Sequence, residues 1–289
     1  MPKVINIAKL AGFCYGVKTA IETIKKIKTQ NPNKEIFVLG AIIHNSQVIS
    51  ELENLGIHTV ETLPANSGNA ICVIRTHGET PENIQKIRNA GFEIVDLTCP
   101  DVKKVQSKGV DLAKNGYFTI IIGKNNHPEV VAIRANVLQF SPDTAVVNSV
   151  EDVEKLSDKL KNKKIGVVIQ TTQPISNVQP IICRLMEYSK ELKIENTICP
   201  STKNRQKEAV ELAQKSDLMI VAGSKESANT THLAHLCSEI TNTIHIETKD
   251  EIFDYMDLIK NSNTISITAG ASTPKELIES VLRLIEKEK

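Results

Sequence analysis

The sequence predicts an α/β protein built from three similar small units with parallel sheets, in a pseudo-threefold arrangement. Three observations lead to this prediction. Short apolar runs of strand length alternate along the chain with amphipathic helical segments. The same order of helix, strand and loop recurs three times. A cysteine stands at the same place in each recurrence: Cys14, Cys99 and Cys199.

The composition indicates a folded protein and excludes several classes of function. The 289 residues include 40% hydrophobic and 24% charged side chains, an ordinary balance for a globular chain. The formal net charge is +1 and aromatic residues make up 3%, so the basic excess and stacking rings of a nucleic-acid binder are missing. No apolar run approaches the ~20 residues of a membrane span, and no secretory signal is visible. We expect a cytoplasmic protein that binds neither nucleic acid nor membrane.

The first half of each repeat is a cysteine, an amphipathic helix and a strand that ends in glycine. Helices are expected at residues 17–28, 102–114 and 205–215, where apolar side chains recur at intervals of three and four. The apolar runs that follow end 24 to 26 residues after each cysteine, at Gly40, Gly123 and Gly223. A polar loop comes next, and it holds His44 and Asn45, then His127 and Glu129, then Ser227 and Asn229.

The second half of each repeat is a strand, a loop that ends in proline, and a helix. The strands are expected at residues 71–74, 165–169 and 264–267, and the loops at 76–81, 170–174 and 269–274. Proline is tolerated where a helix begins, because the first N–H groups of a helix have no partner within it. In the first two repeats a further strand, at residues 92–97 or 192–197, leads to the next cysteine.

The third repeat lacks this closing strand, and the missing strand is found at the other end of the chain. Residues 4–7 form a short apolar run before Cys14. We therefore expect the N-terminal strand to complete the C-terminal unit. The predicted units are residues 14–98, residues 99–198, and residues 199–289 completed by residues 1–13.

The side chains that could bind a ligand or take part in a reaction all follow the carboxyl ends of predicted parallel strands. Ligands of open α/β sheets bind at this edge. If the three units face one axis, the three cysteines meet in one central cavity. The same cavity then receives His44, His77, His127, Thr171, Thr172, Ser227, Asn229 and Ser272.

Three converging thiolates indicate a soft metal or an iron–sulfur cluster. A [4Fe-4S] cluster with three cysteine ligands would leave one iron with an open position for a substrate oxygen. A zinc ion with three thiolate ligands is the competing interpretation, and three unrelated thiols are the third. The other cysteines, Cys72, Cys183 and Cys237, lie in strand or helix patterns, and we interpret them as small apolar filler.

The remaining loop residues favour an anionic ligand. Imidazole, hydroxyl and amide groups near helix N-termini are typical of phosphate or diphosphate sites. Glu129, two residues after His127, is a carboxyl group within such a loop and a candidate proton donor. No G-x-G-x-x-G or P-loop motif occurs, so electrons for a redox reaction must come from outside the chain.

These residues resemble the 4-hydroxy-3-methylbut-2-enyl diphosphate reductase family, whose enzymes end the non-mevalonate isoprenoid route. The resemblance covers nearly the whole chain, and the motifs occur in order. The motifs are GFCYGV at 12–17, IHN at 43–45, RTHGE at 75–79, DLTCP at 96–100, HPE at 127–129, QTT at 170–172, TIC at 197–199, NRQ at 204–206, GSK at 223–225 and TAGAS at 268–272.

The resemblance implies a site in detail. It implies one [4Fe-4S] cluster held by Cys14, Cys99 and Cys199, with Glu129 as the proton donor. Thr171 would position the substrate alcohol. The implied diphosphate ligands are His44, His77, His127, Ser227, Ala228, Asn229 and Ser272. The implied reaction removes the allylic hydroxyl with two electrons and two protons, giving isopentenyl and dimethylallyl diphosphate. Ferredoxin or flavodoxin would deliver the electrons, with NADPH upstream.

One position departs from the family pattern. Ala228 stands where the family usually has serine, so only its backbone N–H can serve a phosphate. Losing one neutral hydrogen bond costs roughly 0.5–1.5 kcal/mol, which would weaken binding by about tenfold at most. Two other functions fit the residues without the resemblance: a three-cysteine iron–sulfur dehydratase, and a redox-responsive anion-binding sensor without enzymatic activity.

Overall fold

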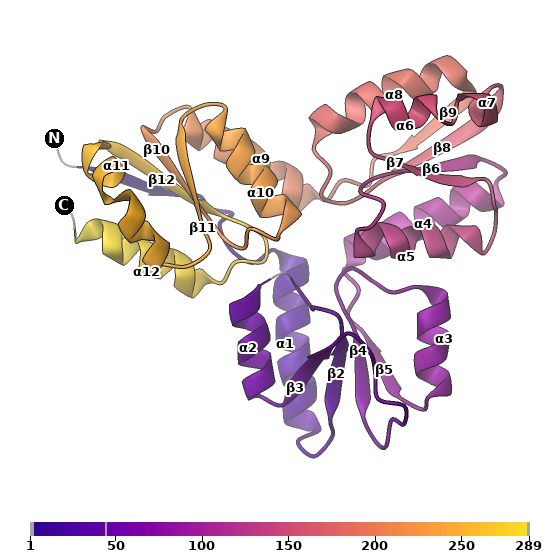
Figure 1. Cartoon of the computed structure of the whole chain (residues 1–289), viewed down its shortest axis with the longest axis horizontal. Helices are drawn as coiled ribbons and strands as arrows, with labels where there is room; N and C mark the ends of the chain where they lie inside the picture. Colours follow the sequence, from indigo (N-terminus) through magenta and orange to yellow (C-terminus); the bar gives the residue numbers. More distant parts are fainter. Residues whose placement is uncertain (1–2, 44, 288–289) are drawn as a thin grey trace. The chain divides into compact units, whose positions relative to one another are not determined.

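The structure, a computed structural model, describes residues 3–43 and 45–287. Within them, twelve strands form three four-stranded sheets (Figure 1). The strands are β1 (Val4–Ile7), β2 (Ile36–Leu39), β3 (Ile57–Val60), β4 (Ile71–Ile74), β5 (Glu93–Asp96), β6 (Phe118–Ile122), β7 (Thr144–Val147), β8 (Lys163–Ile169), β9 (Ser189–Glu195), β10 (Leu218–Ala222), β11 (Asn242–Ile246) and β12 (Thr264–Ala269).

Helices follow nearly every strand, as the alternating pattern predicts. They are α1 (Tyr15–Gln30), α2 (Ser46–Asn54), α3 (Pro81–Asn89), α4 (Pro100–Lys114), α5 (Pro128–Leu138), α6 (Val150–Glu154), α7 (Ser157–Leu160), α8 (Ile175–Tyr188), α9 (Pro200–Ala213), α10 (Ala228–Ser238), α11 (Met256–Asn261) and α12 (Lys275–Glu286), with a 3-10 helix η1 (Asp250–Tyr255). None of the helices among the described residues is long and apolar enough to cross a membrane.

The three sheets share one strand order, which confirms three similar α/β units with parallel sheets. The orders are β3-β2-β4-β5, β7-β6-β8-β9 and β11-β10-β12-β1. Every pairing in them is parallel. Corresponding strands therefore hold corresponding places, and the loops after them lie at the same edge of each sheet.

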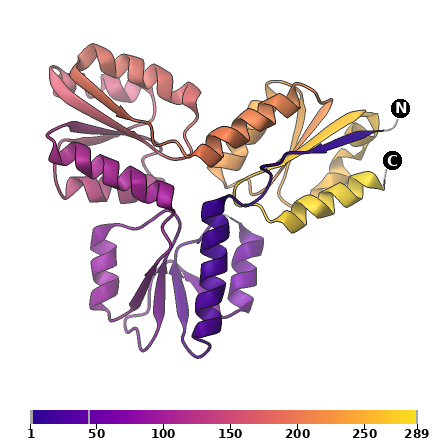
Figure 2. The ribbon, with the colours of Figure 1, turned by 180° about the vertical axis from the view of Figure 1, so that it is seen from behind.

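The N-terminal strand β1 takes the place in its sheet that β5 and β9 take in theirs. It pairs with β12 in the register Val4↔Thr264 to Ile7↔Ile267. Figures 1 and 2 show β1, in indigo, in the sheet that contains β12. This is the pairing expected from the missing closing strand.

Two layers of helices cover the sheet of β6 to β9, and alternate side chains of its strands supply both cores (Figure 1). Ile120 and Ile122 of β6 point into a cluster with Val178 and Leu185 of α8. Ile121, between them, packs on the other face with side chains of α4 and α5. A strand buried on both faces explains the continuous apolar run in the sequence.

The sheet of β1, β10, β11 and β12 is built in the same way. Ile220 of β10 packs with Val281 of α12, whereas Val221 packs on the other face with Ala209 of α9 and Leu233 of α10. In the sheet of β2 to β5, Cys72 packs beneath the α3 residue Ile87. The repeat therefore extends from strand order to the packing of the helices.

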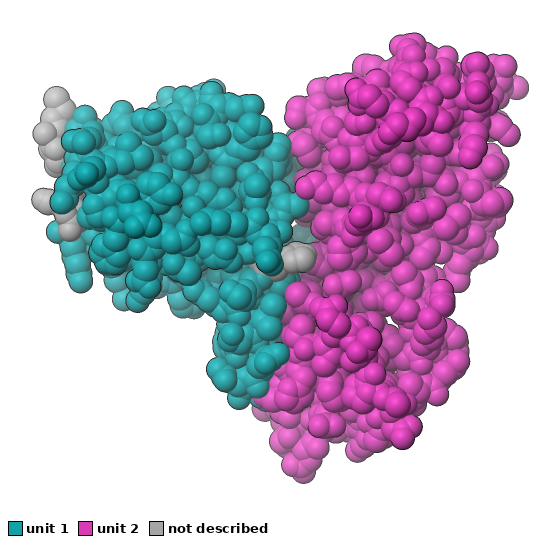
Figure 3. Space-filling model, in the orientation of Figure 1, with its two compact units in different colours: residues 1–23, 43–55, 200–289 teal, residues 24–42, 56–199 magenta. Residues whose placement is uncertain are grey.

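Two compact units divide the chain, and Figure 3 shows them in different colours. Unit 1 consists of residues 1–23, 43–55 and 200–289, and unit 2 consists of residues 24–42 and 56–199. Unit 1 contains the sheet with β1, and unit 2 contains the other two sheets. The division into three units of residues 14–98, 99–198 and 199–289 stays a prediction.

Each sheet has one strand that the sequence pattern did not indicate. These edge strands are β3, β7 and β11, at residues for which no element was predicted. They are short and only partly buried, so their apolar signal is weak. Helix α8 begins at Ile175, directly after Pro174, and accommodates Pro180 in its second turn.

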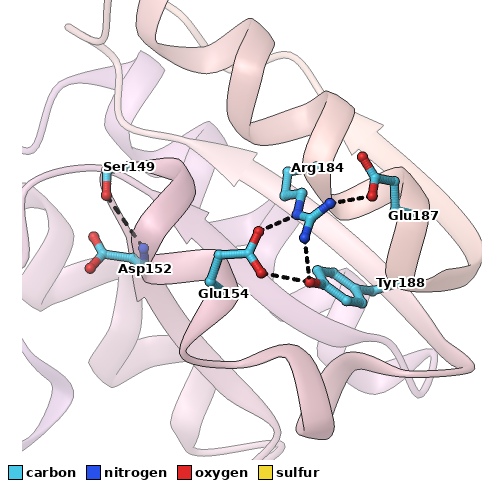
Figure 4. A network of polar contacts seen from close by, with 6 residues as sticks. All are labelled: Ser149, Asp152, Glu154, Arg184, Glu187 and Tyr188. Carbon is cyan, nitrogen blue, oxygen red and sulfur yellow. Dashed lines mark hydrogen bonds and ion pairs between the residues drawn. The ribbon is translucent and has the colours of Figure 1, made fainter.

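A polar network ties α6 to α8 on the surface of unit 2 (Figure 4). Arg184 of α8 forms ion pairs with Glu154 of α6 and with Glu187, and it donates a hydrogen bond to the Tyr188 hydroxyl at 2.9 Å. The Tyr188 hydroxyl in turn donates to Glu154 at 2.7 Å. Because these groups are partly exposed, we assign the network a modest structural role.

Deleting residues 1–8 should destabilise the sheet that β1 completes. Strand β12 loses its neighbour along residues 264–267, so its amide hydrogen exchange should rise most, followed by that of β10. The measurement is hydrogen exchange of the deletion variant and the full chain. Strands β6 and β8 of unit 2 serve as the internal control. Loss of protection confined to unit 2 would contradict the structural role assigned to β1.

Candidate active site at the strand-to-helix loops

Each of the three predicted cysteine ligands is held by the same backbone hydrogen bond. The N–H groups of Cys14, Cys99 and Cys199 donate at 3.0 Å to the carbonyl groups of Ala271, Thr76 and Thr171, respectively. A helix begins at the next residue in all three cases, at Tyr15, Pro100 and Pro200. The three half-buried thiols therefore share one local geometry, beside helix N-termini that favour negative charge.

The loop before Cys14 is fixed by charged side chains of α9. The buried Arg205 guanidinium donates to the carbonyl oxygen of Gly12 at 2.9 Å and to that of Ala269 at 2.7 Å. The Glu208 carboxylate accepts the N–H groups of Lys9 and Leu10. These hydrogen bonds hold the backbone at Lys9, Leu10 and Gly12, so they fix the loop that leads to Cys14 within unit 1.

In unit 2, threonines fix the loops before the other two cysteines. Thr98 donates its N–H, at 2.9 Å, and its hydroxyl to Asp96. Thr197 accepts the N–H of Ile169 at 2.8 Å. Beyond these loops the Cys199 thiol donates to Asp101 Oδ2 at 2.9 Å.

The donor set fits an iron–sulfur group in its chemistry. None of the six cysteines forms a disulfide, and the three in the repeat loops are half-buried. Cys14 belongs to unit 1, whereas Cys99 and Cys199 belong to unit 2. No group of three or more His, Cys, Asp or Glu side chains that could hold a metal occurs within residues 3–43 and 45–287. The convergence of all three thiols stays a prediction.

The other cysteines differ from these in burial. Cys72 and Cys237 are buried, and burial raises the pKa of each thiol to about 11, as expected for apolar filler. The interpretation of Cys183 as buried filler is wrong, because its side chain is exposed on α8. It lies between Ile182 and Arg184, on the face of the helix that turns away from the core cluster.

Corresponding helices begin at the three polar loops, and each begins with a side-chain cap. Asn45, His127 and Ser227 accept the N–H of Val48, Glu129 and Thr230 at the starts of α2, α5 and α10. The residue that corresponds to His127 and Ser227 is thus Asn45, one position after the expected His44. His44 lies outside the described residues. Helix N-termini of this kind bind anions.

Two of the predicted histidines lie together in unit 2. The rings of His77 and His127 meet edge to face, with 5.4 Å between their centroids. His127 Nδ1 accepts the Glu129 N–H at 3.2 Å, which leaves the ring proton on Nε2. Nε2 is then a hydrogen-bond donor, the role that a phosphate oxygen requires.

The predicted residues of unit 1 lie at the start of α10 and after β12. Ser227, Asn229 and Ser272 are almost fully buried, and Ala228 is the first residue of α10. Asn229 Nδ2 is buried without a hydrogen-bond partner among the residues that the structure describes. An amide donor left in this state costs stability unless a ligand accepts its hydrogen bond. This observation supports an anionic or polar ligand here.

Glycine is required where the first strand of the repeat ends, in the first and third repeats. Gly40 has φ +70°, and a Cβ there would lie 2.2 Å from Arg75 Nη1. Gly223 has φ +135°, and a Cβ there would lie 2.3 Å from Thr273 Oγ1. The strand therefore ends where a side chain of the neighbouring site loop crosses its backbone.

Glu129 and Thr171 form the most buried polar pair of the site. Glu129 is 1% exposed. The Thr171 N–H donates to Glu129 Oε1 at 2.7 Å, and the Thr171 hydroxyl donates to Oε2 at 2.8 Å. Burial is the largest effect on the pKa of Glu129 and raises it to about 7. The two hydrogen bonds from Thr171 act in the opposite direction, and the charge of Asp101 acts in the same direction as burial. A carboxyl with this pKa can give up a proton near neutral pH.

Asp101 and Arg205 are site residues for which the sequence pattern indicated no role. Asp101 follows Cys99 by two residues, but its contact with Cys199 joins positions 98 residues apart. Arg205 lies in the NRQ motif, yet its partners are carbonyl groups, which carry no sequence signal. Asp101 lies two residues after Cys99, and this short spacing is the sequence signal that could have drawn attention to it.

Comparison with known proteins places this arrangement in a family. The chain matches the family described as LytB protein over residues 5–286. The chain belongs to the LytB family. One relative is the 4-hydroxy-3-methylbut-2-enyl diphosphate reductase of Aquifex aeolicus, 36% identical over an alignment that covers 98% of this chain and 96% of that protein. As a LytB member with relatives of this kind, the chain is an oxidoreductase.

Other LytB relatives carry the same name. The enzyme of the same name from Trichlorobacter lovleyi is 40% identical, with 98% of both chains covered. The one from Clostridium tetani is 38% identical, and this chain spans 44% of its length. A solved structure of (E)-4-hydroxy-3-methyl-but-2-enyl diphosphate reductase superposes with a TM-score of 0.76 at 34% identity, covering 99% of both chains. The Plasmodium falciparum reductase structure gives a TM-score of 0.87 at 29% identity, with 98% of this chain and 88% of that chain covered.

Proposed function

We propose that this chain reduces (E)-4-hydroxy-3-methylbut-2-enyl diphosphate, the last step of non-mevalonate isoprenoid precursor biosynthesis. The allylic C–O bond breaks, two electrons and two protons enter, and isopentenyl or dimethylallyl diphosphate leaves with water. The observation that carries the proposal is the LytB match over residues 5–286, which spans every candidate site residue.

The proposed cofactor is one [4Fe-4S] cluster, held by Cys14, Cys99 and Cys199. LytB reductases are iron–sulfur enzymes, and three thiols in one repeated backbone setting support this ligand set. When bound, the cluster supplies the electrons of the reduction. The chain carries no nucleotide-binding motif, so we propose ferredoxin or flavodoxin as the donor, with NADPH upstream.

The proposed diphosphate site uses the N-termini of α5 and α10 and the loop after β12. His77 and His127 offer ring N–H donors, and the buried Asn229 amide offers a donor that has no partner among the described residues. Ser227, the Ala228 N–H and Ser272 complete the set in this proposal, and His44 joins it by the sequence resemblance. The helix dipoles add a favourable field for the phosphate charge.

We assign proton delivery to Glu129, with Thr171 as the group that orients it. Two hydrogen bonds from Thr171 fix both carboxyl oxygens, and burial keeps the proton on Glu129 up to about neutral pH. The Thr171 carbonyl group also accepts the Cys199 N–H. Thr171 therefore connects the proposed proton donor, Glu129, to the loop that carries the proposed cluster ligand Cys199.

The test is anaerobic reconstitution with iron and sulfide, followed by a product assay with the allylic diphosphate and a one-electron donor. We expect isopentenyl and dimethylallyl diphosphate to form only when the donor is present. Turnover without added electrons would indicate a dehydratase. Tight substrate binding without any turnover would indicate a sensor, and either result would contradict the proposal.

A further inference from the structure

Gln170 is the first residue of the QTT motif, and its side chain links two loops of unit 2. It directly follows β8 and is 1% exposed. Its Oε1 accepts the N–H of Lys124, in the loop after β6, at 3.1 Å. The same oxygen accepts a hydrogen bond from Gln173 Nε2 at 3.2 Å, and Gln170 Nε2 donates to the Thr172 hydroxyl at 3.3 Å. A Cβ at Gly123 would lie 2.8 Å from Gln170 Oε1, so glycine leaves room for this side chain.

The hydrogen bond to Lys124 closes a ring of hydrogen bonds around the candidate proton donor. The Lys124 carbonyl oxygen accepts the His127 N–H at 3.0 Å. His127 Nδ1 accepts the Glu129 N–H at 3.2 Å, and the Glu129 carboxyl group accepts both donors of Thr171, at 2.7 and 2.8 Å. Thr171 follows Gln170 in the chain, so the ring is closed. The loop that carries His127 and Glu129 is therefore held at both ends by the loop after β8.

A buried amide has an ordinary structural explanation, because its polar atoms need hydrogen-bond partners wherever it lies. Gln173 provides a direct comparison in the same loop. It is 5% exposed, its Nε2 donates to Gln170, and its Oε1 accepts a hydrogen bond from the Asn177 side chain at 2.9 Å. These bonds stay within residues 170–177. Burial explains both amides, but it does not explain why Gln170 reaches the backbone of the neighbouring loop.

We propose that Gln170 is a positioning residue, which holds His127 and Glu129 in place for diphosphate binding and proton delivery. The inference deepens the proposed function and rests on it. Gln170 acts through the Lys124 backbone and not on a reacting atom. Positioning of this kind matters, because a displacement of about 1 Å can lower a rate by about a hundredfold.

The test compares Gln170→Met, which keeps the length of the side chain but removes both polar groups, with Gln170→Glu. A glutamate oxygen can still accept the Lys124 N–H, whether or not the carboxyl group is ionised. Gln173→Met is the matched control, since it removes a similarly buried amide of the same loop and leaves the Lys124 hydrogen bond in place. Each full chain is reconstituted with iron and sulfide. Amide hydrogen exchange of residues 124–129 is measured by mass spectrometry, and turnover is measured with the allylic diphosphate.

We expect the exchange of residues 124–129 to rise at least about tenfold in Gln170→Met, because this loop loses its hydrogen bond to the loop after β8. Turnover of this variant at saturating substrate should fall at least about tenfold. Gln170→Glu should restore most of the loop protection and most of the turnover. Gln173→Met should lower thermal stability, yet keep wild-type exchange in this loop and wild-type turnover.

Unchanged exchange of residues 124–129 in Gln170→Met would overturn the inference, and so would wild-type turnover of that variant. An equal loss of turnover in Gln173→Met would also overturn it, because the amides would then act only through stability. If Gln170→Met folds poorly, Gln170→Glu decides: wild-type protection of the loop supports the inference, and loss of protection in the folded variant contradicts it. Failure of the proposed function is distinguishable, because the wild type would then form no product while the exchange comparison would still report on the loop.

Discussion

Replacing Glu129 by glutamine is expected to reduce turnover at saturating substrate by at least about a hundredfold. A positioned proton donor typically contributes ~10²–10⁴ in rate, or roughly 3–5 kcal/mol of transition-state stabilisation. Glutamine keeps the shape of Glu129: its oxygen can still accept the Thr171 N–H, and its NH2 group can donate to the Thr171 hydroxyl, but it has no transferable proton. Iron and sulfide content and substrate affinity should stay near those of the wild type.

The pH dependence of turnover gives a second readout of the same residue. With a pKa of about 7, Glu129 is protonated below neutral pH and loses its proton above it. Turnover of the wild type should therefore fall as the pH rises through about 7, and the residual turnover of Glu129→Gln should lack this decline. A raised carboxyl pKa also means that the folded chain binds the proton more tightly. Folding stability should accordingly decline between about pH 4.5 and 7, and less so in the variant.

Glu151→Gln is the matched control for Glu129→Gln. Glu151 is also an acidic residue in the first turn of a helix of unit 2, but it is exposed. The turnover of the Glu151→Gln variant should equal that of the wild type. A decrease of less than about fivefold in Glu129→Gln would show that the proton comes from elsewhere, such as the substrate diphosphate or a water at Thr171.

Replacing any one of Cys14, Cys99 and Cys199 by serine is expected to abolish cluster retention and turnover together. A serine hydroxyl is a harder and less acidic donor than a thiol, and it binds iron–sulfur clusters poorly. The backbone hydrogen bond that holds each residue does not involve the side chain, so the fold should survive the change. Iron and sulfide per chain and the visible absorbance of the reconstituted protein are the measurements.

Cys183→Ser and Cys237→Ser are the controls for the cysteine series. Cys183 is exposed, so its replacement should leave cluster content, turnover and stability unchanged. Cys237 is fully buried in the cluster of α9, β10 and α10, so its replacement should lower stability but keep the cluster. Normal iron content in Cys99→Ser, or loss of iron in Cys183→Ser, would contradict the ligand assignment.

The sequence by itself determined the repeat and most of the candidate residues. Continuous apolar runs with a helix between them are sufficient to predict parallel strands buried on both faces, and the structure confirms them at β2, β6 and β10. The place of β1 also followed from counting strands, since only the third repeat lacked one. The partly buried edge strands β3, β7 and β11 could not be predicted in this way, because an edge strand with one covered face has too few apolar residues to stand out.

Only the tertiary structure decided which residues interact. Thr171 and Glu129 lie 42 residues apart, and Asp101 and Cys199 lie 98 apart. The first contact arises because β6 and β8 are neighbouring strands that deliver their loops to one edge of the same sheet. The second arises because α4, which follows β5 of one sheet, packs on the sheet that contains β9. The depth of Glu129, and hence its pKa of about 7, depends on the helix and strands that cover it. Burial of a carboxyl group is a property of its surroundings, so no local pattern in the sequence could reveal it.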